Sequence, residues 1–194
     1  PLPPPRRPSP PAVSPPTSPP RPAPPLETLS TARLVHAVLS SSFNSQAYPA
    51  AAAIDGNPRT LCASSWQSNA WLSVRLAAEA PVGYVAILNR ADSAEYQAWL
   101  SPYEVWVGHG YGDLATQCAG PVSVTAGVGP FMVWCRGVRG TTVTLRQVGR
   151  PRYLTIAEME VFTLPPSAPP LSPPTALPSV PPPTVLPPCN PYPS

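Results

Sequence analysis

Short segments of alternating hydrophobic and polar residues run through the middle of the chain, from residue 26 to residue 164. A period of two is the pattern of a β-strand that buries one of its faces. Gly, Pro, Asn and Asp separate the segments, and no long stretch has the period of a helix. The pattern predicts strands at 33–43, 71–76, 82–89, 103–108, 131–135, 141–147 and 153–162. We therefore expect an all-β domain, an antiparallel β-sandwich or jelly roll.

Proline marks off two flanks on either side of this segment. Of the 35 prolines, 14 lie in residues 1–25 and 14 lie in residues 165–194. Proline fixes φ and lacks an amide donor, so such flanks cannot join a sheet or sustain a helix, and polyproline II remains open to them. We expect a polyproline II rod at 1–25, one globular domain at 26–164 and a second polyproline II rod at 165–194.

Charge and motifs argue against several classes of function. The net charge is +3, but residues 26–164 carry nine Arg and nine Asp or Glu, so we expect no basic face for nucleic acid. No apolar run is long enough to span a membrane. There is no GxSxG, HExxH or glycine-rich phosphate loop, and the two histidines have no motif around them. We do not expect an enzyme.

The four cysteines indicate an oxidising compartment. Cys118 and Cys135 flank a segment rich in Gly, Val and Thr, and we predict that they form a disulfide that closes a hairpin or a short crossover. Two buried free thiols are the alternative. Cys62 and Cys189 can pair with each other only if the C-terminal flank folds back, and a bond to another chain is the other possibility.

The flanks repeat the sequence Ser-Pro-Pro, three times before residue 21 and once more at 172–174. This spacing resembles the hydroxyproline-rich glycoproteins of plant and green-algal walls, including the pherophorin-like proteins. The resemblance implies O-glycosylated hydroxyproline; a bare proline-rich linker is the alternative. The implied sites are Pro10, Pro11, Pro15, Pro16, Pro19, Pro20, Pro173 and Pro174.

Five motifs follow one another through the domain: AAAAIDGN at 50–57, WQSNAWLSVRL at 66–76, VAILNRAD at 85–92, YEVWVGHG at 103–110 and IAEMEVF at 156–162. Their order resembles the discoidin, or coagulation factor 5/8 type C, domain, and most closely its fucolectin branch. The resemblance implies an eight-stranded jelly-roll β-sandwich whose N- and C-termini lie near one another.

The same resemblance implies a structural calcium ion. Asp55 and Glu158 would supply carboxylates, while Asn57 and backbone carbonyls near Ala52 and Ser64 would supply neutral oxygens. Calcium takes six to eight oxygen ligands, and loop carbonyls suit it. The alternative is that Asp55 only caps a turn that ends in a glycine with positive φ, and that Glu158 is a solvated strand residue.

A sugar site is only partly implied. Fucolectins bind fucose with one histidine and two arginines, and here only Arg90 matches. The second arginine is replaced by Gln97, and residues 65–66 hold no histidine. The resemblance therefore implies the fold without strong fucose binding. Arg90 has an alternative role as the partner of Asp92 or Glu95 in a salt bridge.

Tryptophan is the other candidate for ligand contact. Trp66 and Trp99 lie in loop-like segments, and sugar rings and polyproline both stack on indole rings. The alternative is a role in the core, because Trp71, Trp106 and Trp134 lie in predicted strands.

Together these features predict a structural component of an extracellular glycoprotein fibre or matrix, such as a cell wall or ciliary surface. In it the discoidin-like domain would dock glycans or polyproline rods of neighbouring chains, so the expected partners are copies of itself, other proline-rich glycoproteins and carbohydrate. The first alternative is a calcium-stabilised lectin carried on glycosylated stalks. The second is adhesion to membrane lipid.

Overall fold

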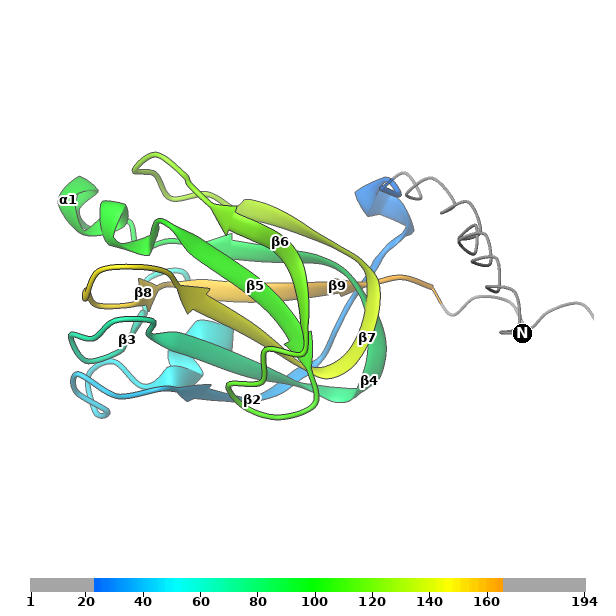
Figure 1. The fold of residues 1–194 in the computed structure, drawn as a ribbon, viewed down its shortest axis with the longest axis horizontal. Coiled ribbons are helices and arrows are strands. Elements are labelled where there is room, and N and C mark those ends of the chain that lie inside the picture. The colour runs from blue at the N-terminus through cyan, green and yellow to red at the C-terminus, as the bar shows by residue number, and fades with distance from the viewer. Residues whose placement is uncertain (1–22, 166–194) are drawn as a thin grey trace, which may run out of the picture.

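The computed structural model describes residues 23–165, and this part of the chain is mostly antiparallel β-structure with a few short helical turns (Figure 1). The described strands are β1 (Ser30–Thr31), β2 (Leu34–Leu39), β3 (Cys62–Ala63), β4 (Trp71–Leu88), β5 (Tyr103–Gly108), β6 (Thr116–Val122), β7 (Phe131–Gln147), β8 (Thr155–Ile156) and β9 (Glu158–Thr163). The helical turns are η1 (Leu26–Thr28), η2 (Ala50–Ile54), α1 (Ala94–Gln97) and η3 (Ala98–Leu100).

Two long strands, β4 and β7, bend side by side and thereby contribute to both layers of the sandwich (Figure 1). The first half of β4 pairs with β2 and with the second half of β7, which in turn pairs with β5, and β5 with β6. The second half of β4 pairs with β9 and with the first half of β7, and β9 pairs with β1. The register shifts between Arg75 and Ala80, where β4 bends.

A glycine allows β7 to bend against its neighbour. A Cβ atom on Gly140 would lie 2.6 Å from the carbonyl oxygen of Gly108 at the end of β5, so no larger residue fits there without moving the backbone. Inward-facing residues of both layers then close over one core. Its largest fully buried side chains include Tyr103, Leu72, Ile87, Leu100, Leu145, Leu154, Ile156 and Met159.

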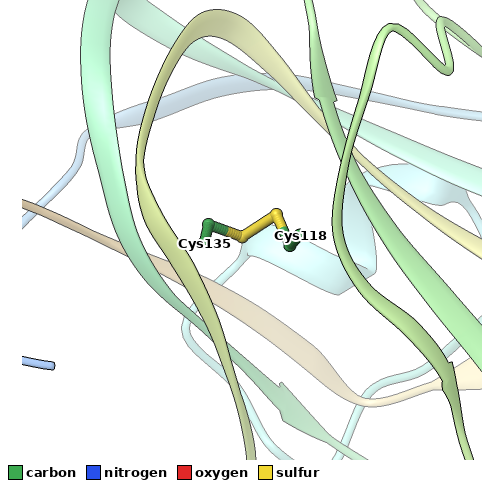
Figure 2. Close-up of a disulfide and its surroundings, with 2 residues drawn as sticks. All are labelled: Cys118 and Cys135. Carbon is green, nitrogen blue, oxygen red and sulfur yellow. A yellow bond between two sulfur atoms is a disulfide. The ribbon is translucent and has the colours of Figure 1, made fainter. Parts of the chain in front are cut away.

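The predicted disulfide is present and joins the two layers (Figure 2). Cys118 lies on β6, and Cys135 lies on the first half of β7, which pairs with β4 rather than with β6. Both cysteines are buried. Of the two geometries that the sequence left open, the structure has the crossover, because the connection from β6 to β7 passes from one layer to the other.

The predicted strands lie where the structure has strands, but several of them are parts of longer strands, so their number differs. The strand at 103–108 is confirmed, while the four segments at 71–76, 82–89, 131–135 and 141–147 prove to be halves of β4 and β7. The segment at 153–162 divides into β8 and β9. The sequence missed β6, an edge strand that contains glycine and proline. The described residues thus hold nine strands rather than eight.

The two ends of the described chain lie together, as expected, because Ser30 on β1 pairs with Thr163 on β9. The loops at 40–49, 64–70, 89–102 and 148–154 gather at the opposite end, which we call the loop end (Figure 1). No helix among residues 23–165 is long and apolar enough to cross a membrane. The predicted O-glycosylated prolines and Cys189 lie outside the described range. So do the predicted polyproline II rods at 1–25 and 165–194, except for residues 23–25 and 165.

Candidate functional site

Six aromatic side chains gather at the loop end, and we call them the aromatic cluster: Phe43, Tyr48, Trp66, Tyr96, Trp99 and Tyr153. Tyr153 is its centre. The centroid of its ring lies 5.3 Å from that of Phe43, 5.2 Å from that of Trp66 and 5.3 Å from that of Trp99. Tyr96 lies against Trp99 at 4.7 Å. Loops distant in sequence therefore build one continuous aromatic surface.

This surface borders two hollows. A pocket of about 180 Å³ is lined by Phe43, Tyr48, Leu61, Ala63, Arg90, Tyr96, Trp99, Tyr153 and Thr155. A second hollow, of about 380 Å³, lies between Trp66, Trp99 and the loop that contains Arg150. Trp99 lines both, so the two hollows adjoin at this residue. Phe43 and Trp66 are 57% and 58% exposed, which leaves their rings open to a ligand.

Arg90, the residue that matches the fucolectin motif, lines the smaller pocket and is already paired. Its Nε and Nη2 atoms each donate a hydrogen bond of 2.6 Å to the Asp92 carboxylate, and its guanidinium lies 4.6 Å from the centre of the Tyr96 ring. The hydrogen bond to Asp92 raises the pKa of Arg90, and the same bond lowers the pKa of Asp92. The structure therefore has the predicted alternative, a salt bridge to Asp92, at the edge of the pocket.

Asn89 fixes the loop that carries Arg90. It is 1% exposed, and its side-chain amide donates hydrogen bonds to the carbonyls of Gln97 (2.9 Å) and Gly127 (3.1 Å). Its side-chain oxygen accepts a hydrogen bond of 2.9 Å from the amide of Arg90. A buried asparagine with these bonds ties the two ends of the 89–97 loop together and holds Arg90 and Tyr96 in place.

Two polar residues that the sequence did not single out, Gln147 and Arg152, bind the backbone carbonyl of Trp99. The Trp99 carbonyl accepts hydrogen bonds of 2.7 Å from both Arg152 Nε and Gln147 Nε2. Arg152 is 5% exposed and also donates to the carbonyls of Pro102, Val148 and Arg150. Burial, together with the nearby charge of Arg150, lowers its pKa. Arg152 thus acts as a buried clamp between the 99–102 and 148–150 loops.

A pair of carboxylates forms a second candidate site, at the turn after η2. The backbone amide of Asn57 donates to Asp55 Oδ1 and to Glu158 Oε1, both at 2.8 Å, although Asn57 and Glu158 are 101 residues apart. The hydroxyl of Thr60 donates to Asp55 at 2.9 Å. Gly56 has a φ of +76°, as a turn glycine allows.

The electrostatics of this pair favour a cation. Burial and the neighbouring Asp55 carboxyl raise the pKa of Glu158 to about 7. Burial acts to raise the pKa of Asp55 as well, but the Asn57 amide and the hydrogen bonds with Glu158 and Thr60 outweigh it and lower that pKa. Glu158 is only 8% exposed, so the alternative of a solvated strand residue is wrong.

The donor set fits the calcium ion that the resemblance implies. Two converging carboxylates, hydroxyl oxygen and turn carbonyls are hard oxygen ligands of the kind that calcium takes. Ala52 is buried within η2, beside the turn, and Ser64, whose backbone carbonyl the resemblance implies, is buried after β3. The Thr60 hydroxyl, which donates to Asp55, is a further candidate oxygen that the sequence did not single out. No group of three or more Asp, Glu, His or Cys side chains converges within residues 23–165.

Cys62 is part of the hydrophobic core. It is fully buried on β3, where it pairs with Ile156 of β8, and it has no disulfide partner within the described chain. Burial raises the pKa of its thiol to about 12. A bond from Cys62 to Cys189 or to another chain, as the sequence allowed, would require the domain to open.

Comparison with known proteins agrees with this architecture. Residues 37–117 match the family model of the F5/8 type C domain. Among solved structures, a fucolectin from striped bass serum superposes with a TM-score of 0.58 at 25% identity, over 66% of this chain and 45% of that one. The chain thus spans less than half of that lectin. A comparison with curated proteins gave no match.

This chain also aligns with nearly the whole length of two further solved structures. The lectin domain of lectinolysin in complex with Lewis B antigen aligns with 66% of this chain and 92% of its own, at 23% identity and a TM-score of 0.58. The family 32 CBM of Clostridium perfringens NanJ in complex with galactose aligns with 71% and 96%, at 19% identity and a TM-score of 0.55. Residues 23–165 therefore share the β-sandwich fold of these domains, and residues 37–117 resemble the F5/8 type C domain in sequence.

The structure brings Arg90, Trp66 and Trp99 to one end of the domain and Asp55, Asn57 and Glu158 to one turn. The sequence did not point to the other four aromatic residues, Phe43, Tyr48, Tyr96 and Tyr153. Read alone, Tyr48 and Tyr96 are ordinary loop residues, while Phe43 and Tyr153 stand at the ends of the segments 33–43 and 153–162 that were predicted as strands. No motif links the four along the chain.

Proposed function

We propose that this domain is a carbohydrate-binding module whose ligand rests on the aromatic cluster. The observation that carries the proposal is the cluster itself, six rings from four loops that border adjoining hollows at one end of the sandwich. The apolar C–H face of a sugar ring stacks on such surfaces while its hydroxyls reach polar groups at the rim. The Lewis B and galactose complexes of similarly folded proteins support carbohydrate as the ligand class. Nothing in the proposal requires the domain to be an enzyme.

The chemistry of the site favours a neutral glycan of more than one sugar. The guanidinium of Arg90 is bound to Asp92 through two of its three nitrogens, which leaves few charged donors for a single sugar. Hydrogen bonds to sugar hydroxyls largely replace bonds to water, so several donors or a wide stacking surface are needed for affinity. Two hollows that meet at Trp99 can hold consecutive sugar rings. We therefore expect weak binding of free fucose and tighter binding of an oligosaccharide.

Glycan binding is tested by titrating the full chain with fucose, galactose and a panel of neutral oligosaccharides in a calorimeter. Trp66→Ala removes an exposed ring of the cluster and should weaken oligosaccharide binding by about tenfold or more. Tyr111→Ala is the matched control, because Tyr111 is also exposed but lies outside the cluster. Equal affinities of the two variants, or no binding of any glycan by the wild-type chain, would refute the proposal.

A role in an extracellular fibre is a second proposal. The disulfide fits an oxidising compartment, and the two described ends of the domain lie together at the end opposite the loop end (Figure 1). Flanks attached at that end leave the cluster free to bind glycans of neighbouring chains. Extraction of the native protein with its polymer, and its release by competing oligosaccharide, would support this arrangement.

A structural calcium ion at Asp55 and Glu158 is part of the same proposal. Asp55, Thr60 and the turn carbonyls come from the segment after η2, and Glu158 comes from the last strand. The ion would neutralise the two carboxylates and join this segment to β9. The carboxylates already converge on the Asn57 amide, so little rearrangement would be needed.

A further inference from the structure

A row of aromatic side chains crosses the outward side of the layer formed by β9, β4 and β7. Tyr84 on β4 is paired with Phe162 on β9 and with Trp134 on β7. Paired residues on neighbouring antiparallel strands point to the same face of a sheet. The next residue on each strand, Val85, Val161 or Val133, is buried in the core, so the aromatic row faces outward.

The apolar strip continues from this row along β4. Ala86 and Leu88 follow Tyr84 at a spacing of two, and Met132 stands opposite Ala86 on β7 with 37% of its surface exposed. The strip ends in a hollow of about 240 Å³ bordered by Pro58, Pro130 and Leu88. From Tyr84 to Leu88 the strip is about 13 Å long, at the usual rise of a strand. We call the row and strip together the outer groove.

The outer groove is unusual for an exposed sheet face. Such a face normally carries polar side chains that alternate with the buried ones. Here the outward positions on β4 are Tyr84, Ala86 and Leu88. Two carboxylates stand at the side on β9, Glu160 opposite Ala86 and Glu158 opposite Leu88, and both border the hollow. An apolar groove with a negative edge is suited to an apolar segment that carries positive charge.

The chain itself enters the domain beside this groove. The side chain of Leu29, just before β1, lies with Trp134 against the same side of Gly83: a Cβ on Gly83 would be 3.3 Å from Leu29 Cδ2 and 3.5 Å from a Trp134 ring carbon. The described residues begin at position 23, only six residues before Leu29. Residues 1–22 are therefore attached to the domain close to one end of the aromatic row.

We propose that residues 1–22 bind along the outer groove of their own domain. This segment holds 12 prolines, and aromatic-lined grooves bind proline-rich segments in the polyproline II form. At about 3.1 Å per residue, four or five residues span the groove. The segment also carries three arginines and no acid, whereas residues 165–194 carry no charged residue, so Glu160 favours the N-terminal flank.

The closest arginine is within reach of this carboxylate. Arg21 precedes Leu29 by eight residues, a chain length of at most about 29 Å when extended. Glu160 on β9 pairs with Ala86, which is two residues along β4 from Tyr84 in the aromatic row. Because the segment is tethered to the domain, its effective concentration is high and modest contacts suffice to hold it.

The two methionines of the chain provide the test, because hydrogen peroxide oxidises exposed methionine faster than buried methionine. Met132 lies in the groove, while Met159 is 1% exposed in the core and reports unfolding. In the full chain, replacing the prolines of residues 1–22 by serine should speed oxidation of Met132 at least about fivefold, since protection follows the fraction of time that the groove is covered. Glu160→Gln should also speed it, and Met159 should stay slow in every protein.

Glu79→Gln is the matched control, since Glu79 is an exposed acid that pairs with Arg139 away from the groove. It should leave Met132 oxidation unchanged. Equal rates in the wild-type and serine-substituted chains would overturn the proposal. Protection that disappears on tenfold dilution would also overturn it, because the segment would then come from a second copy of the chain.

Discussion

One backbone amide, that of Asn57, is hydrogen bonded to two carboxylates that compete for it. Asp55 is close to it in sequence, and Glu158 arrives from the last strand, so folding brings two negative charges together at one turn. Without a cation, the burial of Glu158 and its proximity to Asp55 both disfavour its charged form, so burial first and Asp55 second raise its pKa. The residues that implied a calcium ion in the sequence are thus coupled by the fold.

Calcium is expected to raise the melting temperature of the full chain. At a calcium concentration about 100 times the dissociation constant, binding to the folded state alone adds about 2.7 kcal/mol to the free energy of unfolding. Asp55→Asn and Glu158→Gln should each remove this gain, because each loses a charged ligand, whereas Glu79→Gln should keep it. Calorimetric scans with calcium and with chelator measure the shift, and its absence in the wild-type chain would exclude the site.

Strand length was the main structural feature that alternation alone could not define. The pattern located both halves of β4 and both halves of β7, but interrupted each strand where it bends between the layers. At such a bend the strand passes from one layer of the sandwich to the other, so the period of two breaks although the strand continues. The edge strand β6 was missed because glycine and proline within it are typical of turns.

The disulfide between β6 and β7 should stabilise the domain by joining its layers. A loop of this size is worth about 3 kcal/mol in the chain-entropy model. The Cys118→Ala/Cys135→Ala double variant should therefore lose about that much stability, measured as a lower urea midpoint together with a steeper slope, because the unfolded chain without the cross-link exposes more surface. Peptide mapping without reduction should show the Cys118–Cys135 link in the wild-type chain, and a link from Cys118 to Cys62 would contradict the fold.

On the scale of the whole molecule, Cys62 reports whether the sandwich is closed. Cys62 is fully buried on β3, beside β8, so a reagent cannot reach it in the folded domain. Burial also raises the pKa of its thiol to about 12, so little reactive thiolate forms.

Iodoacetamide at pH 8 should consequently label Cys62 only as fast as the domain unfolds, and urea should speed the labelling steeply. Mass spectrometry of the full chain after timed labelling follows the reaction. Rapid labelling in the absence of urea, or a mapped Cys62–Cys189 disulfide in the folded chain, would show that the core is open at β3.

The sequence by itself determined the fold class, the disulfide pair and the motif residues Asp55, Glu158 and Arg90. Alternation, cysteine spacing and short motifs are local, and each can be recognised along the chain. Only the tertiary structure decided that Phe43, Tyr48, Tyr96 and Tyr153 join Trp66 and Trp99, and that Arg152 clamps the Trp99 loop. These residues come from loops with no common pattern, and their proximity depends on how the two layers of the bent sheet bring the loops to one end.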